Sequence, residues 1–416
     1  MRLGHGLILA ALALLIIGVV MVNSAGLTVD AITPISLRGV LLGRPAVYAA
    51  LAVVMLVIGS LVPVDRLFTL RGGLSPIPWI VAGMIALLFA ANLPGIGHAE
   101  NGARRWINLG SLTFQPSEVA KWSLPIVIAW HCARRGDALS RFRTGFLPPL
   151  AIATIVCALI AKEDLGTAVL VFGVCIAMLL AAGCRVWHAA LLMIPAAAGI
   201  VGLILTSPYR VNRILAYLDP YKDAQGIGYH IIQSITAVSG GGVAGRGLGN
   251  SIQKFDYLPE DTTDFIFAIL CEELGVAGAV VVGALYATIM ICGLGIVRRA
   301  KTPFSRLLGL GIVLTLGFQA VMNLAVVTGL APTKGIALPL LSRGGTGWLL
   351  TAFAIGLLVS IDRAAGPVAE ADDEQADDAS ESLDRSLVAE PILRRGSEEV
   401  PQHVVDRAIP LGAGAQ

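Results

Sequence analysis

Long apolar runs separated by short polar segments recur along most of this chain. The hydrocarbon core of a bilayer is about 30 Å thick, so a helix that crosses it needs about 20 mostly apolar residues. Each run of that kind predicts one spanning helix. The runs cover residues 7–26, 45–64, 77–93, 117–133, 147–162, 166–183, 187–206, 264–297, 307–329 and 345–362. The pattern therefore predicts an all-α integral membrane protein with about ten transmembrane helices.

The composition supports this fold class. Hydrophobic residues make up 56% of the 416 residues and charged residues only 14%, which excludes a water-soluble globular protein. A formal net charge of +2 gives no reason to expect a nucleic-acid partner. The six cysteines lie in or beside apolar runs without C-x-x-C spacing, so we interpret them as buried apolar side chains rather than as metal ligands or disulfide partners.

The basic residues of the short loops predict the orientation of the helices. Cytoplasmic loops of membrane proteins carry an excess of Lys and Arg. One set of loops holds most of them, namely Arg2, Arg66, Arg71, Arg134, Arg135, Arg141, Arg143, Arg185, Arg298, Arg299, Lys301, Arg306 and Arg363. This set adjoins both ends of the apolar region, so both termini are predicted to be cytoplasmic.

Two segments differ from the apolar runs. Residues 207–263 form a long loop rich in glycine, polar and aromatic residues, which the predicted topology places outside the cell, and loops of this length are usually functional. Residues 364–416 open with a cluster of Asp and Glu among Ala and Ser, a composition that cannot bury enough apolar surface to fold. The domain prediction is a transmembrane domain over residues 1–363, followed by a disordered acidic cytoplasmic tail.

Ionisable groups beside the apolar runs are candidates for function, because such groups are costly at membrane depth. Pro116 suits the first turn of a helix, where Glu118 and Lys121 would share one face and pair. Glu163 and Asp164 stand at a helix junction, where they could bind a divalent cation or cap the next helix. An ion pair with only a structural role and a plain cap remain open for these two places.

The glycine-rich part of the long loop also leaves alternatives open. Gly240, Gly242 and Gly245 match the G-x-G-x-x-G pattern, but no buried strand precedes them and they are predicted to lie outside the cell. A nucleotide site of the Rossmann type is therefore excluded. The glycines could approach a phosphate or a sugar closely, or form a plain mobile turn.

Asp264 begins the apolar run 264–297, which predicts one helix longer than the membrane is thick. Its carboxylate is therefore expected near the outer interface, where a helix N-terminus would lower its pKa unless desolvation offsets that effect. The structural alternative is a capping box with Asp261 as N-cap. Glu272 and Glu273 are assigned to the cytoplasmic half of the spans.

A carboxylate and several basic residues on the outer side fit a reaction on an amphiphilic substrate with an anionic headgroup. One base and one cationic cluster suffice for glycosyl transfer from a lipid pyrophosphate, and arginine suits phosphate.

Sequence motifs carry a resemblance to a known family. In chain order they are N-G-A-R-R-W-I, Q-P-S-E-V-A-K, E-D-L-G-T, S-P-Y-R, L-D-P, G-R-G-L-G-N-S, L-P-E-D-T-T-D-F-I-F, E-E-L-G and T-K-G-I-A-L-P-L-L-S-R-G-G. Over residues 1–363 the chain resembles the SEDS family (shape, elongation, division and sporulation). The resemblance implies a ten-helix SEDS fold with a central lipid-facing cavity. It also implies a peptidoglycan glycosyltransferase that polymerises lipid II on the outer face of the bacterial inner membrane.

The resemblance also implies roles for residues and partners. Asp264 would be catalytic, here as general base. The candidate substrate-binding residues are Arg104, Arg105, Glu118, Lys121, Arg210, Lys334, Ser342 and Arg343. Arg343 replaces the usual tyrosine and adds a cation that could contact pyrophosphate. A class B penicillin-binding protein, other divisome proteins and a divalent cation, Mg²⁺ or Mn²⁺, are implied, with Glu163 and Asp164 as candidate ligands.

Competing functions make different predictions. The division (FtsW-like) branch of the family, active at the septum, is favoured over the elongation (RodA-like) branch by the motifs that begin at Gly247 and Asn323. A lipid II flippase would need polar groups across the whole bilayer, whereas the candidates cluster in the outer half. A noncatalytic scaffold would leave the outward polar motifs unexplained.

Overall fold

The computed structural model describes residues 2–26, 37–68, 70, 75–93, 96–100, 103–109, 112–255 and 257–366. All of them except Gly366 belong to one compact unit that ends at Ala365. The predicted tail lies outside the described residues from position 367 onward, so its disorder stays a prediction.

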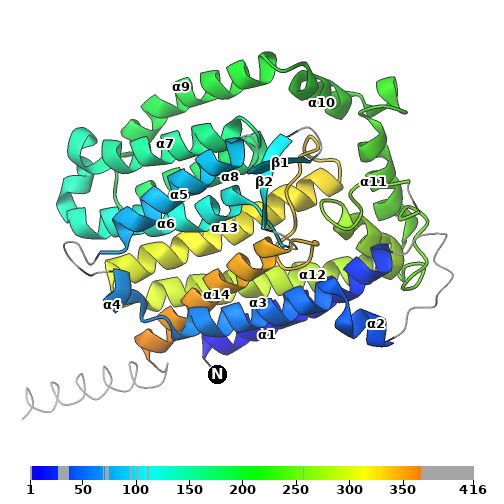
Figure 1. The fold of residues 1–416 in the computed structure, drawn as a ribbon, viewed down its shortest axis with the longest axis horizontal. Coiled ribbons are helices and arrows are strands. Elements are labelled where there is room, and N and C mark those ends of the chain that lie inside the picture. The colour runs from blue at the N-terminus through cyan, green and yellow to red at the C-terminus, as the bar shows by residue number, and fades with distance from the viewer. Residues whose placement is uncertain are drawn as a thin grey trace, which may run out of the picture. The chain divides into compact units, whose positions relative to one another are not determined.

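Each of the ten predicted spans corresponds to a helix of the structure, and these helices run side by side across Figure 1. Their bounds are α1 Leu3–Ala25, α3 Arg44–Leu61, α5 Ile77–Asn92, α6 Pro116–Arg135, α7 Leu147–Ala161, α8 Leu165–Ala181, α9 Val186–Leu205, α12 Ile266–Arg299, α13 Pro303–Val327 and α14 Thr346–Ala365. Within the described residues, seven helical segments are long and apolar enough to cross a membrane, and α5 and α8 are shorter apolar helices. The chain is thus a multi-pass helical membrane protein, as predicted.

Shorter elements connect these helices. They are α2 Leu37–Leu42, α4 Val64–Phe68, the 3-10 helix Gly136–Ser140, the π-helix Phe142–Phe146, α10 Pro208–Leu218, the 3-10 helix Pro220–Asp223 and α11 Tyr229–Gly240. A small antiparallel sheet that the sequence did not predict joins α5 to α6, with strands β1 Gly97–Glu100, β2 Ala103–Leu109 and β3 Leu112–Phe114 in the order β1-β2-β3. The predicted long loop 207–263 is thus helical over about half of its length, in α10, the second 3-10 helix and α11.

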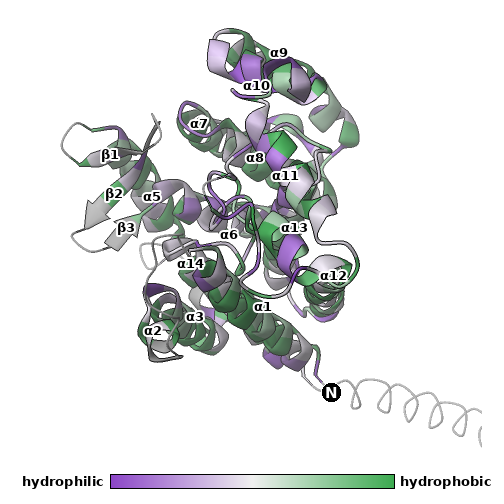
Figure 2. Cartoon of the chain, turned by 90° about the vertical axis from the view of Figure 1, so that its right-hand side faces the viewer, coloured by the Kyte–Doolittle hydropathy of each residue, from purple (hydrophilic) through white to green (hydrophobic). Residues whose placement is uncertain are grey.

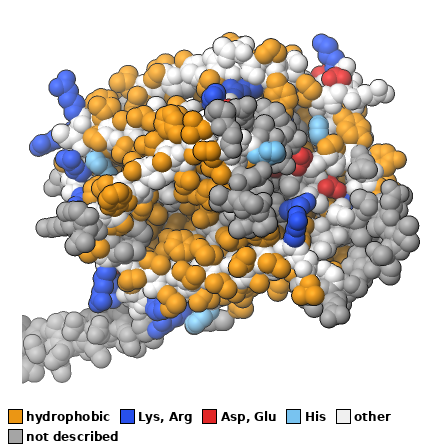
Figure 3. All heavy atoms as spheres, in the orientation of Figure 1, with side chains coloured by type: hydrophobic (Ala, Val, Ile, Leu, Met, Phe, Trp, Pro, Cys, Tyr) orange, Lys and Arg blue, Asp and Glu red, His pale blue; other side chains and the backbone are white. Residues whose placement is uncertain are grey.

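The surface agrees with a protein surrounded by lipid. On the face in Figure 3, hydrophobic side chains cover most of the area, Lys and Arg gather at the left end, and the visible Asp and Glu lie toward the right. Helices α10 and α11 lie at the right-hand end of the bundle in Figure 1, and Figure 2 looks onto that end. We call it the α11 end.

Helix α12 is broken, although the sequence predicted one continuous helix. Gly275 has φ 67° and ψ −160°, a conformation that only glycine adopts readily. The break leaves carbonyls of α12 without helical partners, and the glycine-rich segment 241–250 supplies new donors. The amides of Arg246 and Gly247 donate to the carbonyls of Glu272 and Glu273 at 3.0 and 2.9 Å. This segment therefore acts as a backbone clasp on α12.

Two buried carboxylates lie beside the clasp. Ser251 donates its hydroxyl to Glu272 at 2.5 Å, and Lys254 pairs with Glu273 at 3.3 Å. Ser24 of α1 also donates to Glu273, at 2.8 Å. The assignment of Glu272 and Glu273 to the cytoplasmic half does not agree with the predicted topology, because both carboxylates bind Ser251 and Lys254 at the end of the long loop, which that topology places outside.

We predict that Gly245→Ala destabilises the protein more than Gly249→Ala does. Both glycines have positive φ, which costs alanine about 1–2 kcal/mol. At Gly245, a Cβ would also lie 2.2 Å from the Glu273 carbonyl oxygen, whereas at Gly249 it would meet open space. Thermal unfolding in detergent should show the larger fall in Tm for Gly245→Ala, because the close contact with the carbonyl adds about 1–3 kcal/mol of strain to the folded protein. Equal falls would contradict the role of this segment as a clasp.

Candidate active site

Asp264 lies in the turn that precedes α12. The helix begins at Ile266 with Phe265 as its N-cap residue, so the structural alternative of a capping box with Asp261 as N-cap does not hold. The turn is closed by the amides of Thr263 and Phe265, which both donate to the Glu260 carbonyl at 3.2 Å. Glu260 itself has φ 58°, an unusual conformation for a side chain of its size. Asp264 is therefore held by a tight turn rather than by a helix.

A side chain from α13 fixes the backbone of this turn. Asn323, which is almost fully buried, donates from Nδ2 to the Asp264 carbonyl at 2.8 Å and to the Ile336 carbonyl at 2.7 Å. Ile336 belongs to the irregular segment 329–345 between α13 and α14. One amide therefore ties the turn of Asp264 to that segment.

The carboxylate of Asp264 and a guanidinium both lie close to Gly335. A Cβ built on Gly335 would lie 3.1 Å from Oδ2 of Asp264 and 4.0 Å from Nη1 of Arg105. The missing side chain thus leaves the space in which the two charged groups approach one backbone position. Arg105 comes from β2, so the small sheet brings a cation to the start of α12.

A second carboxylate, that of Asp164, pairs with Arg105. Asp164 is the N-cap residue of α8, and its oxygens accept from the amide and the hydroxyl of Thr167 at 3.0 and 2.8 Å. Oδ2 of Asp164 is also 3.7 Å from Nη1 of Arg105. The cap alternative of the sequence is confirmed, and the same carboxylate pairs with the arginine.

Two further cations complete the cluster. Arg213 of α10 donates from Nη1 to the Thr333 carbonyl at 3.2 Å. Lys334 and Asp164 both approach Gly166, where a built Cβ would lie 3.3 Å from the Lys334 Cδ and 3.4 Å from Oδ1 of Asp164. Burial lowers the pKa of Lys334, opposed by the charge of Asp164 and reinforced by that of Arg213. We call Arg105, Asp164, Arg213, Asp264 and Lys334 the charged cluster.

The charged cluster changes the proton affinity of Asp264. Burial raises the pKa of Asp264 to about 7, and the negative charges of Glu260 and Asp164 act in the same direction, while Arg105 and Arg213 oppose them. Desolvation thus outweighs any lowering by the nearby helix N-terminus. A carboxyl group with this pKa can take up and release a proton near neutral pH.

The predicted pair on α6 forms inside the bundle. Nζ of Lys121 lies 2.7 Å from Oε2 of Glu118 and donates to Oε1 of Gln319 at 2.8 Å. Gln319 in turn donates to the Ala337 carbonyl at 2.7 Å. Through Gln319 the pair anchors the segment 329–345. Lys121 is only 2% exposed, and the role of the pair toward a substrate stays a prediction.

Two other predicted substrate contacts bind backbone groups. Arg210 donates to the carbonyls of Leu203 and Ala161, both at 2.9 Å, and so ties α10 to the ends of α9 and α7. Ser342 is buried and accepts from the Leu338 amide at 2.7 Å. These contacts stabilise local structure and do not bring either residue into the charged cluster.

The other predicted site residues are Arg343, Arg104 and the candidate metal ligands Glu163 and Asp164. Arg343 is exposed, and its amide donates to the Thr262 carbonyl at 2.9 Å, two residues before Asp264. The side chain of Arg104 lies outside the described residues. In the described part of the chain, no group of three or more His, Cys, Asp and Glu residues could hold a metal ion, and the oxygens of Asp164 already bind Thr167. The residues present do not fit a metal centre built from the protein alone, so the ligand role of Glu163 and Asp164 stays a prediction.

Sequence reasoning missed Arg213 and Asn323 as parts of the site. Arg213 stands one helical turn after Arg210, and only the contacts of α10 show which arginine reaches Thr333. Asn323 is an amide in the middle of an apolar run, and such a group needs a buried partner, which was a usable signal.

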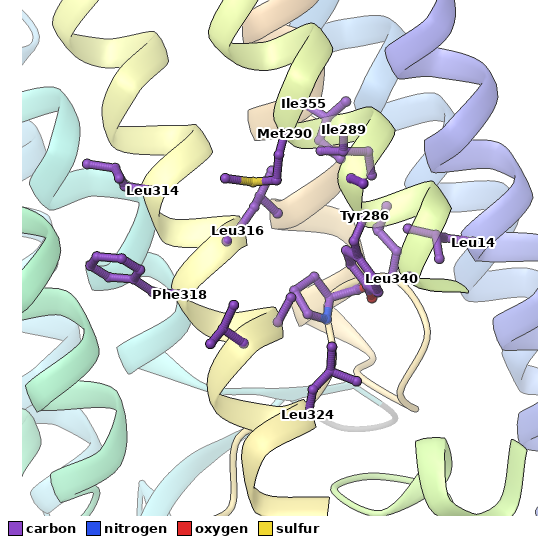
Figure 4. Close-up of a pocket in the computed structure, with 16 residues that line it drawn as sticks. Leu14, Tyr286, Ile289, Met290, Leu314, Leu316, Phe318, Leu324, Leu340 and Ile355 are labelled. Atoms are coloured by element: carbon purple, nitrogen blue, oxygen red, sulfur yellow. The ribbon is translucent and has the colours of Figure 1, made fainter. Parts of the chain in front are cut away.

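An apolar groove lies between α12 and α13 (Figure 4). Its volume is about 350 Å³, and Tyr286, Met290, Phe318 and Leu340 are among its lining residues. Tyr286 donates its hydroxyl to the Pro339 carbonyl at 2.5 Å, so the groove adjoins the segment that carries Lys334 and Gly335. An apolar chain could therefore lie next to a polar site.

The fold and the site define a class of protein: a multi-pass helical membrane protein with a charged cluster at one end of its bundle. A family model described as a cell cycle protein, covering FtsW, RodA and SpoVE, matches residues 5–366. The chain therefore belongs to the family of FtsW, RodA and SpoVE, as the motifs indicated.

Curated relatives agree. A probable peptidoglycan glycosyltransferase FtsW of Geobacter sulfurreducens is 40% identical over 356 residues, which cover 85% of this chain and 94% of the relative. Stage V sporulation protein E of Bacillus subtilis is 41% identical over 278 residues, covering 67% of this chain and 76% of the relative.

Solved structures share the fold. A chain from a structure described as the structural coordination of polymerization and crosslinking by a peptidoglycan synthase complex superposes with a TM-score of 0.67 at 27% identity, covering 86% of this chain and 97% of that chain. The rod shape determining protein RodA of Thermus thermophilus matches with a TM-score of 0.58 at 24% identity, covering 87% and 97%. The second likeness supports the fold alone.

We predict that the titration of Asp264 responds to its neighbours in opposite directions. Glu260→Gln removes a negative charge and should lower the pKa of Asp264, whereas Arg213→Gln removes a positive charge and should raise it. Infrared difference spectra of the protonated carboxyl band, assigned by its loss in Asp264→Asn, would measure the pKa. Asp223→Asn, an exposed change outside the charged cluster, should leave it unchanged. Shifts of the same sign in both variants would contradict the described geometry.

Proposed function

We propose that this protein is a peptidoglycan glycosyltransferase that joins the disaccharide units of lipid II into glycan strands on the outer face of the bacterial inner membrane. The observation that carries the proposal is the charged cluster, in which Asp264 has a pKa of about 7 beside Arg105, Arg213 and Lys334. The names of the curated relatives support the same activity.

The reaction assigns a separate task to each kind of charge. Asp264 takes the proton from the 4-hydroxyl of the acceptor sugar as that oxygen attacks the anomeric carbon of the donor. The bond between that carbon and the phosphate oxygen breaks, the configuration inverts, and undecaprenyl pyrophosphate leaves with the electron pair. Arg105, Arg213 and Lys334 stabilise the negative charge on the leaving pyrophosphate.

The setting in the cell extends this proposal. A class B penicillin-binding protein would crosslink the strands, in line with the description of the synthase complex whose fold this chain shares. Similarity to FtsW and SpoVE relatives at 38–41% identity favours septal work with other divisome proteins over elongation. The end that is rich in Lys and Arg in Figure 3 would face the cytoplasm together with both termini.

Two points concern the alternatives. A flippase needs polar groups along a whole route across the bilayer. Glu272 and Glu273 bind residues of the long loop at the α11 end, so these two buried carboxylates do not extend such a route toward the opposite end. The requirement for Mg²⁺ or Mn²⁺ stays a prediction, and activity after chelation and resupply of each cation tests it.

We predict that Asp264→Asn lowers lipid II polymerisation by at least about 100-fold, because general base catalysis contributes about 10²–10⁴-fold. Strand formation from purified lipid II, with the penicillin-binding partner present, is the measurement. The control is Asp223→Asn, which removes an exposed carboxylate of the long loop and should keep the wild-type rate. Wild-type activity in Asp264→Asn would overturn the role of the base.

We predict that the rate of polymerisation rises with pH up to about 7 and then levels off. The base acts only when deprotonated, and its pKa of about 7 means that the deprotonated fraction falls about tenfold per pH unit below that value. Glu260→Gln should move this limb of the profile to lower pH. A limb that stays in place in Glu260→Gln would assign it to another group.

A further inference from the structure

Helix α10, Pro208–Leu218, has two faces of different chemistry. Val211, Ile214, Leu215 and Leu218 follow the spacing i, i+3, i+4, i+7 and form one apolar face. Leu215 and Leu218 are 57% and 71% exposed. The mixture of hydrophilic and hydrophobic residues on α10 is visible in Figure 2. An exposed apolar face of this kind requires an apolar surrounding.

The other face of α10 binds the protein. Ala216 is buried, Tyr217 donates its hydroxyl to the Leu330 carbonyl at 3.0 Å, and Arg213 donates to the Thr333 carbonyl. Both carbonyls belong to the segment 329–345 between α13 and α14. The apolar face of α10 therefore points away from the bundle.

The preceding helix locates α10 relative to the bilayer. Helix α9 has 20 residues, a length of about 30 Å, which matches the hydrocarbon core. Its side chains are largely exposed, with Trp187 83% and Leu205 70% exposed at its two ends, so lipid surrounds it. Only Thr206 and Ser207 separate α9 from α10. Helix α10 thus begins where α9 leaves the hydrocarbon, and its 11 residues are too few to cross the membrane again.

We infer that α10 lies in the outer interface of the bilayer, with its apolar face among the headgroups and the first acyl carbons of the outer leaflet. Tyr209 and Tyr221 are 57% and 78% exposed at either end of α10, as expected for aromatic residues at a membrane interface. Arg210 holds the junction of α9 and α10 through the carbonyls that it binds. The occupant of the apolar face is lipid, because this face continues from the lipid-exposed surface of α9.

The position of α10 in the interface also affects the charged cluster. This step rests on the proposed function. Arg213 projects from the protein-facing side of α10 to Thr333, next to Lys334. Lipid contacts on the opposite side therefore hold Arg213 in position. The headgroup of a lipid-linked substrate in the same leaflet would lie at the depth of this arginine.

The seating can be tested without any activity assay. Spin labels are attached to single cysteines at Asn212, Leu215 or Leu218, in a full-length protein without other cysteines, in nanodiscs of phosphatidylethanolamine and phosphatidylglycerol. Labels at Leu215 and Leu218 should collide more with oxygen than with a water-soluble nickel chelate, and the label at the exposed, polar Asn212 should do the reverse. Equal nickel accessibility at Asn212 and Leu218 would overturn the inference.

A second arm tests the link to the site. Leu215→Glu with Leu218→Glu should lower polymerisation by at least about tenfold, in the same direction as Arg213→Gln, whereas Asn212→Glu should keep the wild-type rate. Normal polymerisation by the double variant would overturn the link to Arg213. A wild-type protein that does not polymerise would count against the proposed function, while the spin-label result would still decide the seating.

Discussion

The irregular backbone between α13 and α14 is the constraint on which the site depends. Backbone that is neither helix nor strand is tolerated at membrane depth only where protein groups satisfy its amides and carbonyls. Side chains from three helices do this here: Gln319 and Asn323 of α13 bind the carbonyls of Ala337 and Ile336, Tyr286 of α12 binds that of Pro339, and Arg213 of α10 binds that of Thr333. Because Lys334 and Gly335 lie in this segment, the geometry of the charged cluster follows from these bonds.

The same low-dielectric surrounding explains how the charges are distributed. Among the described residues, the buried lysines Lys121 and Lys254 pair with Glu118 and Glu273, and buried Asp362 accepts from the Gly4 amide, since an unpaired buried charge costs several kcal/mol. Asp264 differs, because its neighbours include two carboxylates as well as two arginines, and its pKa is raised to about 7. The described part of the bundle therefore contains neutralised pairs that hold structure, and beside them Asp264, whose carboxyl group can exchange a proton near neutral pH.

The sequence predicted the helices well, because membrane thickness imposes a length that apolar runs reveal directly. It also identified Asp264, Arg105, Asp164 and Lys334, through motifs and through the cost of charge in an apolar protein. It missed the break at Gly275, the sheet at β2 and the contact of Arg213, since each depends on segments distant along the chain. Arg210 and Ser342 carry motif chemistry, yet they bind backbone, a distinction that requires three-dimensional contacts.

The central claim is that polymerisation requires the carboxylate of Asp264 in the position that it takes beside Gly335, which the guanidinium of Arg105 also approaches. The most direct test is lipid II polymerisation by Gly335→Ala, whose Cβ would lie 3.1 Å from Oδ2 of Asp264, beside Gly347→Ala, whose Cβ would lie 3.5 Å from Oε2 of Glu118. With both variants folded to the wild-type Tm, the account predicts that Gly335→Ala loses most of its activity while Gly347→Ala keeps it. Full activity in Gly335→Ala would contradict the account.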